Sequence, residues 1–181
     1  MKKNIDITKA NRLLNTGAVI LVSSKLKDKT NIITMAWQMP LQHNPPLVGI
    51  CMGKENYSYK MIEQSKEFVI NIPNIDLLRQ VLICGELSGK DYDKFKQSGL
   101  TPEESQKVST PSIAECIGCL ECSLKDIVEF ESASIFIGNV LSARIEEGLF
   151  EGFWKVDLPK AKTIHHLGGN NFTIPGELII T

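Results

Sequence analysis

The chain has 181 residues and a formal net charge of −1, with 20 basic and 21 acidic side chains. This length fits one domain with its own hydrophobic core, so we expect residues 1–181 to form a single domain. Because the charges nearly cancel, we expect no nucleic-acid partner. The apolar runs are too short for a membrane span or a signal peptide, which predicts a cytoplasmic protein whose five cysteines are reduced.

The N-terminal part of the chain predicts a short helix followed by a β-hairpin. The first ten or so residues mix a few apolar side chains with polar ones, as a short helix does. Residues 17–24 and 31–37 are apolar and partly β-branched, and a short charged turn joins them, so we expect a hairpin. Strand geometry would place Thr34 and Trp37 on opposite faces of the second strand.

The middle of the chain predicts two helices between further strands. Apolar runs at 47–52 and 68–72 fit buried strands, and Asn56 between them is placed to cap a helix. Apolar residues then recur at helical spacing from 75 to 85. The polar stretch 86–111 predicts a loop with short helices.

The C-terminal part again predicts strands, with Gly138 as a bulge or bend in the longest of them. The expected strands are residues 115–124, 132–145, 154–156, 164–167 and 178–180. Many short strands with a few small helices favour a mostly β protein that closes, fully or partly, into a barrel.

Two common nucleotide-binding motifs are missing. The chain has no Gly-x-Gly-x-x-Gly triplet, so a nicotinamide nucleotide must bind without a Rossmann fingerprint. The segment from Gly85 to Lys90 is one residue short of a phosphate loop and is followed by Asp91 instead of Ser or Thr. A nucleoside triphosphatase is therefore disfavoured.

The expected helix start near Asn56 has the chemistry of an anion site. Free N–H groups of the first turn, the Ser58 hydroxyl and either Lys54 or Lys60 would suit a phosphate dianion. The same residues also fit an ordinary helix cap with solvated lysines. The pattern alone leaves both interpretations open.

Cys116, Cys119 and Cys122 are spaced like metal ligands. Three thiolates fall one short of a closed site, and on a strand Cys116 and Cys122 would share a face while Cys119 points to the other. We therefore predict no metal and ordinary thiols, with a transient disulfide in electron transfer as the alternative.

Several short motifs occur in a fixed order between residues 17 and 169. They are residues 31–37, Pro45-Pro46-Leu-Val-Gly49, Ser58 before a helix, residues 67–71, residues 84–95 with Gly99-Leu-Thr101, Leu120-Glu-Cys122 and His166-Leu-Gly-Gly169. Together they resemble the flavin reductase-like family, which includes flavoredoxins and NAD(P)H-dependent flavin reductases. The resemblance implies a split β-barrel with a few short helices, a homodimer, and FMN in a cleft near the subunit interface.

The resemblance also implies a set of site residues. The residues that would line the flavin are Asn31, Thr34, Met35, Ala36, Trp37, Cys51, Met52 and Gly53. Ser58 would reach its phosphate, and the covering segment would contribute Cys84, Gly85, Ser88, Asp93, Lys94 and Phe95. His166 would have a catalytic role where a nicotinamide approaches, by orienting it or supplying a proton; a hydrogen-bonded structural histidine is the alternative.

FMN carries the redox chemistry itself, so no side-chain nucleophile is required. The expected function is an oxidoreductase that passes hydride or electrons from NADH or NADPH through FMN to free flavin, iron or a protein. One alternative is an FMN-binding electron carrier that exchanges electrons with a redox protein partner and never oxidises NAD(P)H directly. The other is a barrel without flavin that serves as an interaction module.

Overall fold

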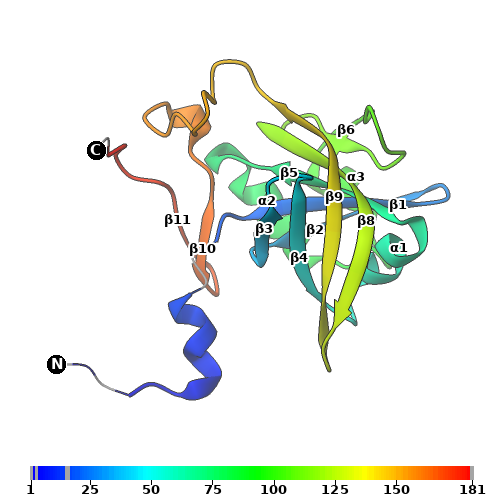
Figure 1. Ribbon diagram of the computed structural model, residues 1–181, viewed down its shortest axis with the longest axis horizontal. Coiled ribbons are helices and arrows are strands. Elements are labelled where there is room, and N and C mark those ends of the chain that lie inside the picture. The colour runs from blue at the N-terminus through cyan, green and yellow to red at the C-terminus, as the bar shows by residue number, and fades with distance from the viewer. Residues whose placement is uncertain (1, 3, 15–16, 180–181) are drawn as a thin grey trace.

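The computed structural model describes residues 2, 4–14 and 17–179. Its centre is a seven-stranded antiparallel sheet with the strand order β2, β1, β5, β8, β9, β4, β3 (Figure 1). The strands are β1 (Ile20–Leu26), β2 (Lys29–Met35), β3 (Gln38–Gln42), β4 (Leu47–Gly53), β5 (Glu67–Ile72), β8 (Gly118–Glu129) and β9 (Ala133–Ile145). Only residues 36 and 37 separate the two edge strands β2 and β3, so the sheet curls into the split β-barrel that was predicted.

The inside of the barrel is a continuous apolar core. Alternate residues of the strands point inward, because side chains on a strand alternate between its two faces. The buried members are Ile20, Val22, Met35, Ile50, Met52, Tyr59, Ile62, Phe68, Ile70, Cys122 and Phe136. Helix α1 (Tyr57–Ser65) contributes two of them, so this helix packs against the barrel interior. Tyr59 meets Phe136 edge to face, with ring centroids 4.8 Å apart.

A second apolar cluster lies outside the barrel, where short helices cover β1 and β2. These are η2 (Ile75–Leu77), α2 (Leu78–Glu86) and α3 (Lys94–Ser98). The helix predicted over 75–85 is therefore confirmed as two consecutive helices. The helix predicted after Asn56 is also confirmed, but the Asn56 side chain donates to the Gly53 carbonyl at 3.1 Å instead of capping α1.

The remaining elements are short. They are η1 (Ile7–Leu13), β6 (Pro102–Glu103), β7 (Ser112–Ile113), η3 (Pro159–Ala161), β10 (His165–Gly168) and β11 (Asn171–Thr173). The hairpin β10–β11 and the N-terminal helix η1 lie together beside the barrel in Figure 1. A bridge between Ala18 and His165 ties the hairpin to the chain just before β1. Within the described residues, no helix has the length and apolar character to cross a membrane.

Several strand predictions were wrong in position. Residues 154–156 form no strand, because Trp154 makes only an isolated bridge with Phe150 before the chain turns towards η3. Residues 178–179 are not in a strand either, and Ile180 lies outside the described residues. Strands β3 and β11 were missed, since β3 is an exposed edge strand that contains Pro40.

Gly138 has a different role from the one predicted. The register shifts on β8, where Lys125 is the extra residue between the pairs Leu124–Gly138 and Asp126–Ile137. The bulge therefore lies opposite Gly138 and not at it. A Cβ on Gly138 would stand 2.6 Å from Cζ of Phe68, so the glycine leaves room for that ring in the core.

Candidate functional site

Two adjoining pockets lie along β2. The large pocket has a volume of about 460 Å³ and is lined by Asn11, Arg12, Val19, Thr34, Met35, Ala36, Trp37, Val81, Leu82, Gly85, Glu86, His166, Asn170 and Phe172. The polar pocket has a volume of about 170 Å³ and is lined by Asn31, Ile33, Glu55, Asn56, Tyr57, Ser58, Cys84, Gly85, Glu86, Leu87, Ser88, Gly89 and Lys94. Gly85 and Glu86 belong to both walls, so the two pockets form one elongated site.

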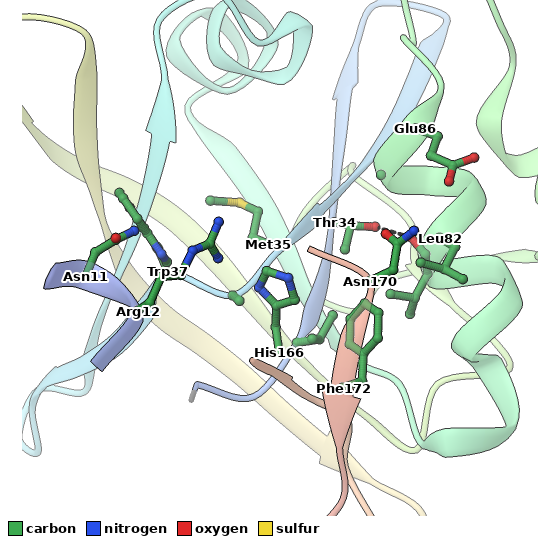
Figure 2. Close-up of a pocket in the computed structure, with 14 residues that line it drawn as sticks. Asn11, Arg12, Thr34, Met35, Trp37, Leu82, Glu86, His166, Asn170 and Phe172 are labelled. Carbon is green, nitrogen blue, oxygen red and sulfur yellow. Dashed lines mark hydrogen bonds between the residues drawn. The ribbon is translucent and has the colours of Figure 1, made fainter. Parts of the chain in front are cut away.

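The large pocket has an apolar interior and a polar rim. Val19, Val81 and Leu82 line it together with residues 34–37 at the end of β2. In Figure 2, Arg12 and Trp37 border one end of the pocket, whereas Glu86 borders the other. The pocket therefore offers apolar walls for a flat ring and opposite charges at its two ends.

Thr34 joins β2 to helix α2. Its hydroxyl donates to the Val81 carbonyl at 2.7 Å, which fixes the side chain against the wall of the large pocket. Thr34 and Trp37 line this same pocket, contrary to the expectation that they face opposite ways. The reason is that β2 ends at Met35, so strand alternation no longer applies at Trp37.

The polar pocket is built around a buried side-chain contact between β2 and α1. Asn31 Nδ2 donates to Ser58 Oγ at 2.8 Å, and both side chains are buried. Asn31 Oδ1 is also buried, and no hydrogen-bond partner for it exists among the described residues. Buried acceptors without partners are rare because desolvation costs about 1–3 kcal/mol. This atom therefore points to a ligand or to a water that completes the site.

Lys94 supplies the positive charge of the polar pocket. Its side chain is only 4% exposed, and Nζ donates to the Cys84 carbonyl at 2.8 Å. Burial lowers the pKa of the Lys94 amine. Two carboxylates, Glu55 and Glu86, also line this pocket, but both residues are exposed and have solvent on one side. The buried polar groups of the pocket are thus a lysine, a hydroxyl and a carboxamide, a donor set that suits an anion.

Five of the predicted flavin contacts lie outside both pockets. Met52 and Phe95 are buried in the two apolar clusters, on opposite sides of the sheet. Asp93 caps α3, where its Oδ1 accepts from the Lys96 N–H at 3.2 Å. The remaining two are Cys51 and Gly53, which lie on β4 next to the pocket walls. Their contact with a ligand stays a prediction.

Cys51 is connected to the large pocket through the backbone. Its N–H donates to the Trp37 carbonyl at 2.9 Å, so β4 holds the segment that carries Trp37. Burial raises the pKa of the Cys51 thiol, which keeps it protonated at neutral pH.

The two adjacent histidines face opposite ways, as expected on a strand. His166 lines the large pocket, and its Nε2 is hydrogen-bonded to the Gly169 carbonyl at 2.9 Å. His165 lines a different cavity on the other side of β10. His166 has the hydrogen bond expected of a structural histidine, and its catalytic role stays a prediction.

Part of the large pocket was missed by the sequence analysis. Arg12 and Asn11 come from η1, and Asn170 and Phe172 come from the hairpin β10–β11. A Cβ on Gly168 would stand 3.2 Å from Nη1 of Arg12, so the absence of a side chain there leaves room for the arginine. Gly168 also has a φ of 123°, which favours glycine. The only available signal was the pair Gly168-Gly169 beside His166, which marks a turn but not the distant residue that packs on it.

The cysteines form no metal site. No group of metal-ligating side chains occurs in the part of the chain that the structure describes, and all five cysteines are free thiols. Cys116 packs in the outer cluster and Cys122 inside the barrel, so the predicted shared face was wrong because Cys116 precedes β8. Burial raises the pKa of the Cys122 thiol to about 12, and burial also raises the pKa of the Cys116 thiol.

Comparison with known proteins assigns this arrangement to a family. Residues 12–159 match the model of the flavin reductase like domain. The chain belongs to the flavin reductase-like family. An uncharacterized protein of Archaeoglobus fulgidus is 36% identical over 81% of this chain and 81% of its own length. The Escherichia coli protein YddH, also uncharacterized, is 32% identical over 97% of this chain and 95% of its own length.

Solved structures of the flavin reductase-like family have the same fold. Flavoredoxin of Desulfovibrio vulgaris superimposes with a TM-score of 0.87 at 25% identity, covering 100% of this chain and 97% of that one. An FMN-binding domain of a flavin reductase-like enzyme from Shewanella baltica has a TM-score of 0.83 at 27% identity, covering 98% and 95%. These likenesses confirm the split barrel and the family resemblance that the motifs indicated.

Proposed function

We propose that this protein is an FMN-dependent oxidoreductase that passes hydride or electrons from NADH or NADPH through FMN to an acceptor. The observation that carries the proposal is the elongated site along β2, where an apolar pocket and a polar, lysine-containing pocket share the wall formed by Gly85 and Glu86. FMN has the same division, with a flat ring system at one end and a phosphate dianion at the other.

The polar pocket fits the phosphate of FMN. Helix α1 begins at Tyr57 beside this pocket, so the positive end of its dipole lies there. Ser58 and Lys94 add a hydroxyl and an ammonium group. The unpartnered Asn31 Oδ1 is a further polar atom at this site, available to a hydroxyl of the ribityl chain. Protein-bound FMN would supply the hydride and electron transfer that the side chains cannot perform.

The large pocket fits the ring system. Its apolar walls, Val19, Val81 and Leu82, exclude water from one side, and Trp37 borders the open end. His166 lines the same pocket and would orient a nicotinamide or hold a proton near it. Arg12 adds a fixed positive charge at the rim, where an anionic donor or acceptor would approach.

A second candidate is an FMN-binding electron carrier that accepts electrons from a protein. It is favoured by likeness to the flavoredoxin described above and to a high molecular weight rubredoxin of Moorella thermoacetica. The latter is 29% identical over 76% of this chain and 59% of its own length. Both proteins are named as redox proteins, and neither name includes a nicotinamide nucleotide.

Anaerobic mixing separates the candidates. FMN-loaded protein is mixed with NADH or NADPH, and loss of the flavin's visible absorption within seconds, the range of typical turnover, supports the oxidoreductase. Bleaching by reduced rubredoxin but by neither nucleotide favours the carrier. Protein that takes up no FMN on reconstitution contradicts both proposals and leaves the interaction module.

A homodimer belongs to the same proposal. The outer face of β3 and β4 is apolar. Leu41 and Ile135 lie on this face, each with a side-chain atom 3.3 Å from the position that a Cβ on Gly49 would take. Met39, on the same face, and Leu41 are each 41% exposed, and Trp37 is 49% exposed. Since Trp37 also lines the large pocket, burying this face against a second copy would place the interface at the rim of the proposed flavin site. We also infer a cytoplasmic location, as the sequence predicts.

A further inference from the structure

A third cavity lies at one end of the barrel, on the other side of β10 from the large pocket. We call it the barrel-mouth cavity; its volume is about 340 Å³. It is lined by Ala18, Ile20, Gln38, Val48, Gly49, Ile70, Ile72, Leu120, Trp154, Val156, Thr163, His165 and Pro175. Its volume falls within the range of small-molecule sites, and nothing in the proposed flavin chemistry uses it.

The inner wall of this cavity is the barrel core itself. Ile20, Val48, Ile70 and Leu120 come from four different strands and belong to, or pack against, the inner apolar cluster. Trp154, Val156 and Pro175, from the segment after β9, form the outer part of the wall. An apolar cavity of this kind is poorly hydrated, and small apolar molecules bind well in such cavities.

The polar groups of the cavity are gathered around Ala18. Gln38 Nε2 donates to the Ala18 carbonyl at 3.5 Å, and Ala18 is bridged to His165. Thr163 Oγ1 is hydrogen-bonded to His165 Nε2 at 3.1 Å. No Asp, Glu, Lys or Arg occurs among the described residues that line the cavity. The cavity therefore has one polar end, apolar walls and no fixed charge to balance an ionic ligand.

We propose that the barrel-mouth cavity binds a small uncharged cyclic molecule that carries one hydroxyl or carbonyl group. The ring lies against Trp154 and the barrel core, and the polar group lies among Gln38, Thr163 and His165. A charged molecule of the same shape is excluded, because it would lose its hydration without gaining a partner charge. This site is separate from the proposed flavin site, and binding there does not require FMN to be present.

The cavity is coupled to the large pocket through one short strand. His165 and His166 are neighbours on β10, and they line the barrel-mouth cavity and the large pocket respectively. A ligand that shifts His165 moves the backbone that holds His166. By linkage, such a ligand changes FMN affinity by the same factor as FMN changes the affinity for the ligand.

The two tryptophans of the chain allow a direct test, because Trp37 lines the large pocket and Trp154 the barrel-mouth cavity. The protein without FMN is titrated with cyclohexylmethanol and, separately, with cyclohexanecarboxylate. The two indole N–H signals, assigned with W37F and W154F, are followed by proton–nitrogen correlation NMR. We expect cyclohexylmethanol to shift the Trp154 signal saturably and the carboxylate to leave it unchanged.

Two variants locate the binding site. V156F fills the cavity and is expected to weaken binding at least about tenfold, whereas V128F, the same change at an exposed residue of β8, is expected to leave it unchanged. T163V keeps the side-chain shape but removes the hydroxyl, so it should weaken cyclohexylmethanol binding several-fold. This variant tests the site independently of whether V156F folds. The proposal is overturned if cyclohexylmethanol does not move the Trp154 signal, or if the carboxylate moves it equally. It is also overturned if the signal changes only when the protein is diluted, because a second copy of the chain would then cover the mouth.

Discussion

Gly89 and Asn31 are in such close contact that a Cβ on Gly89 would stand 1.9 Å from Asn31 Oδ1. Contact at this distance is impossible, so a side chain at position 89 must displace either the loop or the carboxamide. The loop that carries Ser88 and the buried pair Asn31–Ser58 thus depend on Gly89.

The first prediction follows from this contact. Gly89→Ala should weaken FMN binding roughly tenfold, because the displaced Asn31 loses its hydrogen bond to Ser58 and leaves a buried polar group unpaired. Titration of the apoprotein with FMN, followed by flavin fluorescence, measures the change. Gly176→Ala is the matched control, since no atom of the described residues lies within 4 Å of its Cβ position. Equal affinities in both variants would contradict this account of the polar pocket.

Substitutions at Ser58 and Thr34 should weaken the binding of different parts of the flavin. Ser58 lines the polar pocket, so Ser58→Ala should weaken FMN by about 1–3 kcal/mol and leave riboflavin, which lacks the phosphate, nearly unchanged. Thr34 lines the large pocket and its hydroxyl is used by Val81, so Thr34→Ala should affect FMN and riboflavin equally. A phosphate-specific loss in the Thr34 variant would instead place the phosphate in the large pocket.

The buried Lys94 predicts a pH dependence of FMN binding. Because burial lowers its pKa from the ordinary 10.5, the folded apoprotein loses this positive charge at a lower pH than an exposed lysine does. FMN affinity should therefore fall as the pH rises through that lowered pKa, whereas riboflavin affinity should change much less. Lys94→Met should weaken FMN binding at neutral pH and abolish the difference in pH dependence between the two ligands.

The same residue makes a prediction for stability. Between the lowered pKa and 10.5 the unfolded chain binds more protons at this lysine than the folded protein does. The contribution of Lys94 to the free energy of unfolding therefore rises with pH across that window. The difference in urea unfolding between the wild type and Lys94→Met, measured from neutral pH to about the unperturbed lysine value, should follow this rise. A difference independent of pH would mean that Lys94 acts only by packing.

The spacing of apolar residues in the sequence correctly predicted the helices and strands with strong apolar periodicity. The hairpin β1–β2, strand β4 and helix α2 all lie in segments where burial on one face leaves a regular sequence signal. The edge strand β3 and the short hairpin β10–β11 lack that signal, because few of their side chains are buried. Trp154 gave a misleading strand signal, because this apolar side chain lines the barrel-mouth cavity and does not belong to a strand.

The candidate site could be proposed where the family resemblance names a segment. Residues 31–37 were proposed through that resemblance, and Ser58 also through the chemistry of a helix start, and residues of both groups line the two pockets. Arg12 and Phe172 reach the large pocket from the two ends of the chain, and only the packing of η1 on the hairpin brings them together. Such contacts are properties of the tertiary fold and leave no local pattern.

The exposed face of β3 predicts the oligomeric state. Leu41→Asp places a charge on that face, where burial against a second copy would leave it without a partner. We expect the variant to sediment as a monomer and the wild type as a dimer in analytical ultracentrifugation. Ile7→Asp, on the exposed helix η1, is the control for adding one charge elsewhere. A wild type that sediments as a monomer at micromolar concentration would remove the homodimer from the proposal.

A substitution at Gly138 should change the stability of the fold without changing the proposed flavin site. Gly138→Ala would place a methyl group 2.6 Å from Cζ of Phe68 and 3.1 Å from Cβ of Cys122, and both of these side chains are fully buried. Overpacking of this kind costs about 1–3 kcal/mol, while the reduced freedom of the unfolded chain returns only about 0.4–1 kcal/mol. The variant should therefore be less stable in urea unfolding but bind FMN with unchanged affinity when folded. Phe68→Leu in the same chain should recover part of the loss, since the shorter side chain vacates the position that the methyl group needs.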